Sequence, residues 1–172
     1  MKMVMSKVIA CLFLLACCNA VKAQDMSKVT INTVWYQSDS VFAQIYPTTS
    51  VGTEMNGVFK KKMKMVYNGT SSDVKVKEIT IYAYANAAYM QSPANFGIIP
   101  LTQESDKRTY LWLSASAFKA KTNDNIISVK YEKVVDNIFK VTPERKLLPG
   151  EYGFLMRVAG IPTILYGFTI VE

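Results

Sequence analysis

The stretch KLLPGEYGFLMRVAGIPTILYGFTIVE, from Lys146 to Glu172, decides the fold class. It contains two apolar runs, each opened by a proline-containing turn, and in both runs the side chains alternate between two faces. A period of two predicts β-strands that each turn one face toward a core. The residues predicted to share one face are Tyr152, Phe154, Met156 and Val158 in the first strand, and Ile164, Tyr166, Phe168 and Ile170 in the second.

The turn before the first of these strands predicts a specific contact. Pro149 presets φ at the second position of a type II turn, and Gly150 accepts the positive φ that the third position requires. We expect the ring of Tyr152 to pack inward and its hydroxyl to donate a hydrogen bond back to the backbone. This is the arrangement of the tyrosine corner in sandwich domains. The turn is therefore a folding signature.

Alternation with the same period predicts strands along most of the chain. They cover residues 29–36, 41–46, 60–67, 74–84, 109–113, 126–134 and 138–142. Within 74–84 the alternation slips near Lys77-Glu78, which indicates a bulge or burial on both faces. Only 85–90 and 115–121 could form short helical turns. The sequence therefore predicts an all-β fold, an antiparallel β-sandwich of about eight to ten strands.

Residues 1–23 have the three parts of a secretory signal peptide. MKMVMSK is basic, Val8 to Ala16 is uncharged and apolar, and Val21 and Ala23 fit the −3 and −1 positions of a cut before Gln24. The apolar run is shorter than the roughly 20 residues that span a bilayer. We expect an exported protein with one domain, residues 24–172.

A second reading of the leader is a bacterial lipobox. Leu14-Leu15-Ala16-Cys17 would place an acylated Cys17 at the new N-terminus. The intact mass of the protein from its native host separates the two readings. A mature chain that begins at Gln24 supports soluble export to the periplasm or the exterior. A diacylglyceryl group on Cys17 would instead anchor the protein to the outer membrane.

The segment that follows the signal lacks two residue types that many enzymes need. Residues 24–172 contain neither histidine nor cysteine, since all three cysteines lie in the leader. This excludes Ser-His-Asp and Cys-His nucleophile systems and ordinary zinc, copper or haem sites. No glycine-rich phosphate loop is present. We expect no catalytic residue, no cofactor and no metal.

The C-terminal third carries a resemblance. KVTPERKLLPGEYGFLM followed by YGFTIVE resembles the end of uncharacterised secreted proteins of the Bacteroidota, in which a TP…LxPGEYxF segment precedes a final YxF strand. The signal peptide that ends before Gln24 is similar too. The resemblance implies an exported β-sandwich of a Gram-negative envelope. It implies no activity, because the similar proteins have none assigned.

Three weaker signals remain for chemistry. The strings Ser72 to Lys75 and Ser116 to Lys119 have the spacing of a Ser-Lys dyad, but their companion motifs are missing. A carboxylate-based hydrolase needs two facing acids, whereas nearly all thirteen acids lie in turns or on lysine-bearing faces. Glu151 is the one acid among apolar neighbours, and it sits at a turn.

The run Lys60 to Lys64 and the aromatic residues offer surfaces for binding. The lysines could meet phosphate-rich lipopolysaccharide or an anionic membrane, or they could protect an edge strand from aggregation, which we favour. Tyr110 and Trp112 alternate with two leucines. If the leucines face the core, these two rings lie outside and form a platform for a sugar.

We therefore expect a non-catalytic interaction module of the bacterial envelope, whose partner is an envelope protein or a surface polysaccharide. A carbohydrate-binding module that uses Tyr110 and Trp112 is the alternative, and a carboxylate-based hydrolase comes third. Residues 24–172 carry a net charge of only +4, which is too small to indicate nucleic acid. Contact with a membrane is expected only if Cys17 is lipidated.

Overall fold

The chain folds as an all-β antiparallel sandwich, as the alternating sequence predicts. The structure is a computed structural model, and it describes residues 25–57, 60–86, 92–116, 119–122, 125–156 and 163–172. Within these residues the strands form one sheet of five strands and one of nine. Two 3₁₀ helices, η1 (Met26–Lys28) and η3 (Pro93–Asn95), are the helical elements of the described part.

The two sheets have the following strands, in spatial order. The five-stranded sheet contains β11 (Val129–Val135), β12 (Ile138–Pro143), β7 (Thr80–Tyr84), β1 (Val34–Ser38) and β2 (Val41–Ile45). The nine-stranded sheet contains β3 (Pro47–Thr49), β14 (Ile164–Ile170), β13 (Gly150–Leu155), β8 (Gly97–Gln103), β9 (Lys107–Ser116), β5 (Lys60–Asn68) and β4 (Gly52–Asn56), with β10 (Lys119–Thr122) beside β9 and β6 (Lys75–Val76) beside β14. The β6–β14 pair is parallel, whereas the other strand pairs among the described residues run antiparallel.

The fourteen strands of the described residues exceed the eight to ten expected. The additional ones are short, and a short strand gives too few alternations to be read from sequence. Of residues 115–121, expected as a helical turn, 115–116 and 119–121 belong instead to the paired strands β9 and β10, and 117–118 lie outside the described residues. Most of 85–90 lies outside the described residues.

The predicted strand 74–84 is two strands in different sheets. β6 pairs with β14 in the nine-stranded sheet, and β7 pairs with β1 and β12 in the five-stranded sheet. Between them, Lys77 and Glu78 form a bend that carries the chain from one sheet to the other. The slip in alternation therefore marks a crossing between sheets, and the expected bulge is wrong. The alternative, burial on both faces, is confirmed for β7, where the consecutive residues Ile81, Tyr82 and Ala83 are all buried.

The main core lies between the two sheets. Val34, Ile81 and Val141 contribute from the five-stranded sheet, and Phe154 and Phe168 contribute from the other. The last two are fully buried, as the alternation of the C-terminal strands predicts. Phe154 also packs edge to face against Phe96, with ring centroids 5.4 Å apart.

A second core lies on the other face of β13 and β14. Leu155 and Leu165 from these strands, together with Ile99 from β8, pack against Met65 and Tyr67 from β5. The nine-stranded sheet therefore folds over, so that β5 and β9 cover the face of β13 and β14 that a two-layer sandwich would leave to solvent. Burial of Tyr67 raises the pKa of its hydroxyl, and the neighbouring Tyr110 raises it further.

The tyrosine corner forms as predicted. The hydroxyl of Tyr152 donates a hydrogen bond of 2.8 Å to the carbonyl oxygen of Leu148. Its ring stacks on Phe168 with centroids 5.7 Å apart. Gly150 is already in β13 with a φ of 154°, well beyond the roughly +80° of a type II turn, so the corner forms without the expected turn type. The corner thus ties the 148–150 turn to the last strand.

Replacing Tyr152 by phenylalanine is expected to lower the free energy of unfolding by about 0.5–1.5 kcal/mol. The ring stays in place, and the loss is that of one partly buried hydrogen bond. Urea denaturation measures the change. Tyr131→Phe is the control, since that side chain is about half exposed on β11. Equal losses in the two variants would contradict the prediction.

Candidate functional site

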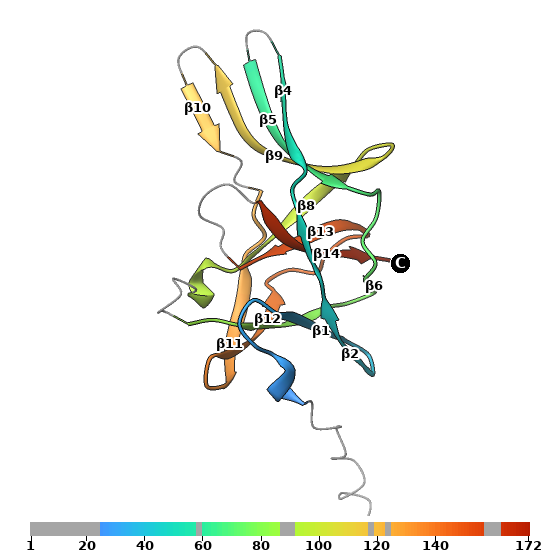
Figure 1. Cartoon of the computed structure of the whole chain (residues 1–172), viewed down its shortest axis with the longest axis vertical. Helices are drawn as coiled ribbons and strands as arrows, with labels where there is room; N and C mark the ends of the chain where they lie inside the picture. Colours follow the sequence, from blue (N-terminus) through green and yellow to red (C-terminus); the bar gives the residue numbers. More distant parts are fainter. Residues whose placement is uncertain (1–24, 58–59, 87–91, 117–118, 123–124, 157–162) are drawn as a thin grey trace, which may run out of the picture.

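An arm of four strands projects from the sandwich (Figure 1). It consists of β4, residues 60–64 of β5, residues 113–116 of β9, and β10, in the order β4-β5-β9-β10. The pairs are in regular register here: Lys62 lies opposite Asn56 and Ser114, and Ser114 lies opposite Lys121. Residues that lie opposite one another on the four strands form a row across the arm, and one such row consists of Asn56, Lys62, Ser114 and Lys121.

The register repeats two residues further along the strands. There Ser116 lies opposite Lys60 on one side and Lys119 on the other. Lysine thus occurs at both rows of β5 and both rows of β10, with serine between them on β9. The sequence analysis missed this arrangement because strand pairing brings the two lysine-bearing segments together.

The arm holds the positive charge of the folded domain. Residues 52–64 and 113–122 contain six lysines and one glutamate, a net charge of +5, whereas the whole of 24–172 carries +4. The rest of the domain is therefore close to neutral. Such an asymmetric distribution attracts anionic partners to one end of the molecule.

The lysine run does not protect an edge strand, which was the favoured interpretation. β5 lies between β4 and β9 in the sheet, so both of its backbone edges are paired. β4 and β10 flank the arm instead, and β4 contains no lysine. The edge-strand expectation for Lys60 to Lys64 is wrong.

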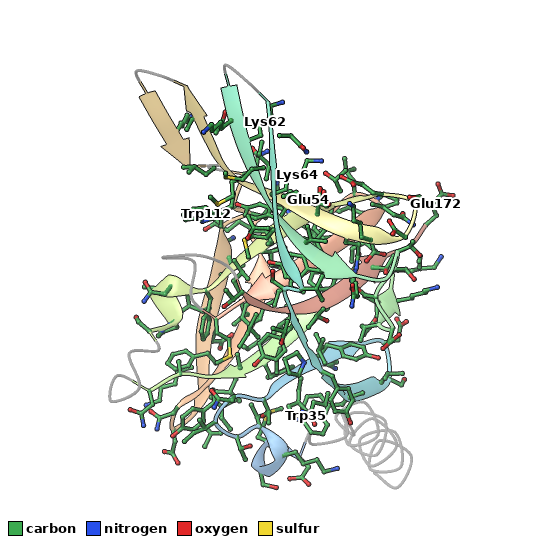
Figure 2. All side chains as sticks on the ribbon, turned by 45° about the horizontal axis from the view of Figure 1, so that its top comes forward. Trp35, Glu54, Lys62, Lys64, Trp112 and Glu172 are labelled. Carbon is green, nitrogen blue, oxygen red and sulfur yellow. The ribbon has the colours of Figure 1, made fainter. Side chains whose placement is uncertain are left out.

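Ion pairs neutralise the lysines nearer the base of the arm. Lys64 Nζ lies 2.7 Å from Glu104 Oε1, and Lys107 pairs with Glu54 and with Glu104. The hydrogen bond from Lys64 holds the pKa of Glu104 below its usual value, and the bond to Glu54 raises the pKa of Lys107. Both shifts favour the charged forms. In Figure 2, Lys62 lies further out along the arm than Lys64 and Glu54.

A buried polar cluster lies beneath this base. Arg108 of β9 and Glu151 of β13 are 4% and 6% exposed, with Arg108 Nη1 3.4 Å from Glu151 Oε2. Ser72 donates to the same oxygen from its backbone N–H and from its hydroxyl, both at 3.0 Å. Thr169 of β14 donates to Glu151 Oε1. The carboxylate is therefore hydrogen-bonded on both oxygens.

The guanidinium of Arg108 also binds the end of β5. Its Nε and Nη2 donate to the carbonyl oxygens of Gly69 and Asn68, each at 3.1 Å, and its Nη1 donates to Ser72 Oγ. Ser72, Arg108 and Glu151 are all buried. The cluster thus joins β9 to β13 and β14, which suits a structural role rather than catalysis.

This cluster also explains one glycine. A Cβ on Gly167 would lie 2.7 Å from Ser72 Oγ and 3.0 Å from Arg108 Nη1. Gly167→Ala is expected to lower the free energy of unfolding by about 1–3 kcal/mol, because the short serine side chain and the bound guanidinium have little room to move. Chemical denaturation tests this.

Gly52→Ala is the matched control for that substitution. Gly52 is also a strand glycine, but nothing lies within 4 Å of its added Cβ. There alanine is expected to be neutral or to stabilise by up to about 1 kcal/mol. Similar effects at both positions would show that crowding at the cluster is not the cause.

The Ser-Lys spacing does not form a dyad at Ser72. Its hydroxyl contacts Arg108 and Glu151, whereas Lys75 is exposed on β6. The side chains of Ser116 and Lys119 lie outside the described part. Glu151 is more than a turn residue, since it lies within β13 and is the acid of the buried pair.

A cavity of about 740 Å³ opens at another part of the molecule. It is bordered by the β1–β2 turn, the bend between β6 and β7, and residues 142–147. Acidic and basic side chains occur there in equal number: Asp39, Glu78, Glu144, Lys77, Arg145 and Lys146. A neighbouring cavity of about 670 Å³ shares Glu144 and Arg145. This balance gives no preference for a cation or an anion.

The proposed sugar platform is not formed as expected. Tyr110 is 4% exposed and belongs to the second core, with Trp112 half-buried against the same core. The expectation that both rings lie outside is wrong for Tyr110. The condition behind the expectation fails, because Tyr110 and Trp112 both pack against the second core, whereas Leu111 and Leu113 are only half-buried. Between the pairs Met63–Leu113 and Lys64–Leu111 the register shifts, so Trp112 is an extra residue in β9.

A different group of aromatic rings lies on the outer face of the five-stranded sheet. Trp35 stacks on Phe42 with centroids 5.2 Å apart, and Phe42 meets Tyr82 edge to face at 5.5 Å. Met26 and Val29 next to η1 pack on the same group. Trp35 lies at the other end of the molecule from Trp112 in Figure 2. The contacts of this aromatic group describe a small core beneath the N-terminal segment.

Some of the predicted features fall on residues that the structure does not describe. The signal peptide and the alternative lipidation site, Cys17, belong to residues 1–24. Among the residues that the structure places, no helix has the length and apolar character to cross a membrane. In the same residues, acidic side chains do not gather into a group that could hold a metal ion.

Comparison with known proteins adds no family to these observations. Neither protein-family models, nor curated proteins, nor solved structures give a match for this chain.

Proposed function

We propose that this protein is an exported, non-catalytic interaction module of the bacterial envelope, and that the arm is its contact element. The projection of the arm beyond the packed sheets carries this proposal (Figure 1). An element that extends from the core presents both of its faces to a partner. The leader at residues 1–23 supports export, and an envelope protein or a surface polysaccharide is the proposed partner.

The division between core and arm supports a binding role. The buried charged pair stabilises the contact between β9 and β13, whereas Met55 on the arm is 62% exposed. Met55 lies opposite the half-buried Met63 in the register, whereas Asn56 and Lys62 lie opposite each other on the other face of the arm and are exposed. Both faces of the arm therefore present side chains to a partner.

Site-specific photo-cross-linking tests the proposal. A photo-reactive residue replaces Met55 on the arm, or Leu148 on the sandwich body as the matched control. Both side chains are well exposed, at 62% and 74%. Each protein is incubated with native cell envelope, and the adducts are analysed for protein and for sugar.

We expect an adduct from position 55 that excess unlabelled protein removes by competition, and no such adduct from position 148. Equal adducts at both positions, or no competed adduct at position 55, would overturn the arm as the contact element. Melting temperatures of both variants establish that the domain remains folded.

A further inference from the structure

We infer that two copies of this chain form a dimer by pairing their β11 strands edge to edge. The pairing is antiparallel and twofold symmetric, and it places Tyr131 of one copy opposite Tyr131 of the other. The two five-stranded sheets then become one continuous sheet. This inference is independent of the proposed function, since β11 and the arm lie toward opposite ends of the molecule in Figure 1.

β11 is the open edge of the five-stranded sheet. The outer strands of this sheet are β2 on one side and β11 on the other. β2 continues through Tyr46 into β3, which connects the two sheets on that side. Residues 130–135 of β11, in contrast, are all exposed. An exposed edge strand presents unpaired backbone groups that can pair with another strand.

The backbone groups that β11 turns to the open edge follow from its register. The backbone N–H of Glu144 donates a hydrogen bond of 3.0 Å to the carbonyl oxygen of Ser128, and the pairing with β12 is regular as far as Lys133. The direction of these bonds alternates along an antiparallel strand, so every second residue from Ser128 bonds toward β12. The residues whose N–H and C=O groups point to the open edge are Val129, Tyr131 and Lys133.

Pairing about Tyr131 uses all of these groups. Val129 of each copy then faces Lys133 of the other, so three residue pairs form and each pair exchanges two backbone hydrogen bonds. The aliphatic stem of Lys133 packs beside Val129 while its ammonium stays in water.

The charges on β11 select this register. Lys130 and Glu132 point to the same face of the sheet, and among the described residues neither forms an ion pair within its own chain. With the axis at Tyr131, Lys130 of each copy faces Glu132 of the other, which gives two pairs of opposite charge. Moving the axis by one residue in either direction would place Glu132 or Lys130 opposite its own copy, where like charges repel.

This arrangement answers the usual role of charge on an edge strand. Charged side chains, lysine above all, discourage edge strands from pairing with one another. On β11 the glutamate stands two residues from the lysine, so an antiparallel copy converts the repulsion into two attractive pairs. The edge is therefore selective for a second copy of itself.

The ring of Tyr131 also favours a second copy. Tyr131 lies opposite the fully buried Val141 in the register, yet it is 48% exposed. Its ring meets Phe139 edge to face with centroids 6.3 Å apart, and Phe139 packs against the main core. Rings directly opposite each other on paired strands can pack together. The dimer would thus extend the main core across the interface.

Sedimentation of the protein of residues 24–172, which contains all the strands of the described part, tests the inference. We expect a monomer–dimer equilibrium that depends on concentration. Lys130→Glu and Glu132→Lys each place like charges opposite one another twice, so each should weaken dimerisation by about tenfold or more. Lys75→Glu is the matched control, since it reverses a charge at an exposed position on β6. It should change the dissociation constant by less than about twofold, because distant surface charges are screened.

An equimolar mixture of the two charge-reversal variants separates the interface from a folding defect. One variant carries only acidic residues at positions 130 and 132, and the other carries only basic ones. The mixed dimer regains both pairs of opposite charge, so we expect it to form about as tightly as the unmodified dimer. A monomer at all concentrations of the unmodified protein would overturn the inference, as would a mixture that does not dimerise or reversals without effect.

Single cysteines test the register. Residues 24–172 contain no cysteine, so one introduced thiol can form a disulfide only with a second chain. Tyr131→Cys places the two Cα atoms about 5.5 Å apart, within the range of a disulfide. Lys133→Cys places them four residues apart along the strands, or about 14 Å. Oxidised glutathione should therefore link the first variant and not the second. Equal yields, or no link at position 131, would overturn the pairing about Tyr131.

Discussion

Replacing Arg108 by methionine is expected to lower the free energy of unfolding by about 3–5 kcal/mol, one of the two largest effects predicted for this chain. The substitution leaves Glu151 buried without its cation, and an uncompensated buried charge carries a penalty of that size. The carbonyl oxygens of Asn68 and Gly69 also lose their donors. Denaturation by urea, followed by tryptophan fluorescence, measures the loss.

A double-mutant cycle separates the pair from the rest of the cluster. Glu151→Met alone leaves the guanidinium buried without its acid, and we expect the double variant to lose less than the two single variants combined. The difference should be about 0.5–3 kcal/mol, as for other residues in contact. Strict additivity would mean that the two charges do not stabilise one another.

Lys64→Met is the control for this substitution. Lys64 forms a hydrogen-bonded ion pair with Glu104 on the same sheet, but both side chains are more than a quarter exposed. Exposed pairs of this kind contribute about 0–1 kcal/mol, so the loss should be small. A comparable loss at Lys64 would show that burial does not set the strength of the Arg108 pair.

The sequence predicts those parts of the fold that depend on neighbouring residues. Tyr152 follows a Pro-Gly turn, and its hydrogen bond to Leu148 spans only four residues. The alternation of Phe154 and Phe168 places them in the core, because side-chain direction in a strand is fixed by its period of two. Such features can be read within one stretch of sequence.

The buried cluster depends instead on residues far apart in the chain. Glu151 meets Arg108 across 43 residues and Ser72 across 79. The local sequence around each of these three residues gives no sign of burial, and the turn before Glu151 predicts a solvent-exposed acid. The sequence of a strand likewise does not show which strands pair with it. The lysine run at Lys60 to Lys64 therefore predicts an edge strand, whereas β5 lies between β4 and β9.

Tyr110 shows that the buried face of a strand depends on its neighbours in the fold. Alternation predicts that Tyr110 and Trp112 share one side of β9, and both pack against the second core. That core is built from residues of β5, β8, β13 and β14, so the sequence of β9 alone does not show which of its faces is buried. The arm is missed for the same reason, since its lysines come from β5 and β10 and meet only through β9.

Leu165→Ala is expected to lower the free energy of unfolding by about 2–5 kcal/mol, the other large effect. Leu165 is fully buried and belongs to the second core. It lies on the face of β14 away from Phe168, where a two-layer sandwich would leave a leucine exposed. Its side chain also packs over Gly153, whose added Cβ would lie 2.8 Å from Leu165 Cδ2.

The expected loss combines the transfer free energy of the removed methyl groups with the cost of the cavity that remains. Ile164→Ala is the matched control, because Ile164 is the adjacent residue of β14 and is 52% exposed. It should cost less than about 1 kcal/mol, since an exposed side chain loses little burial. Equally small losses at both positions would contradict the packing of β5 and β9 over β14. A large loss at Leu165 alone supports that packing, in which Met65 and Tyr67 of β5 and Tyr110 of β9 belong to the same core as Leu165.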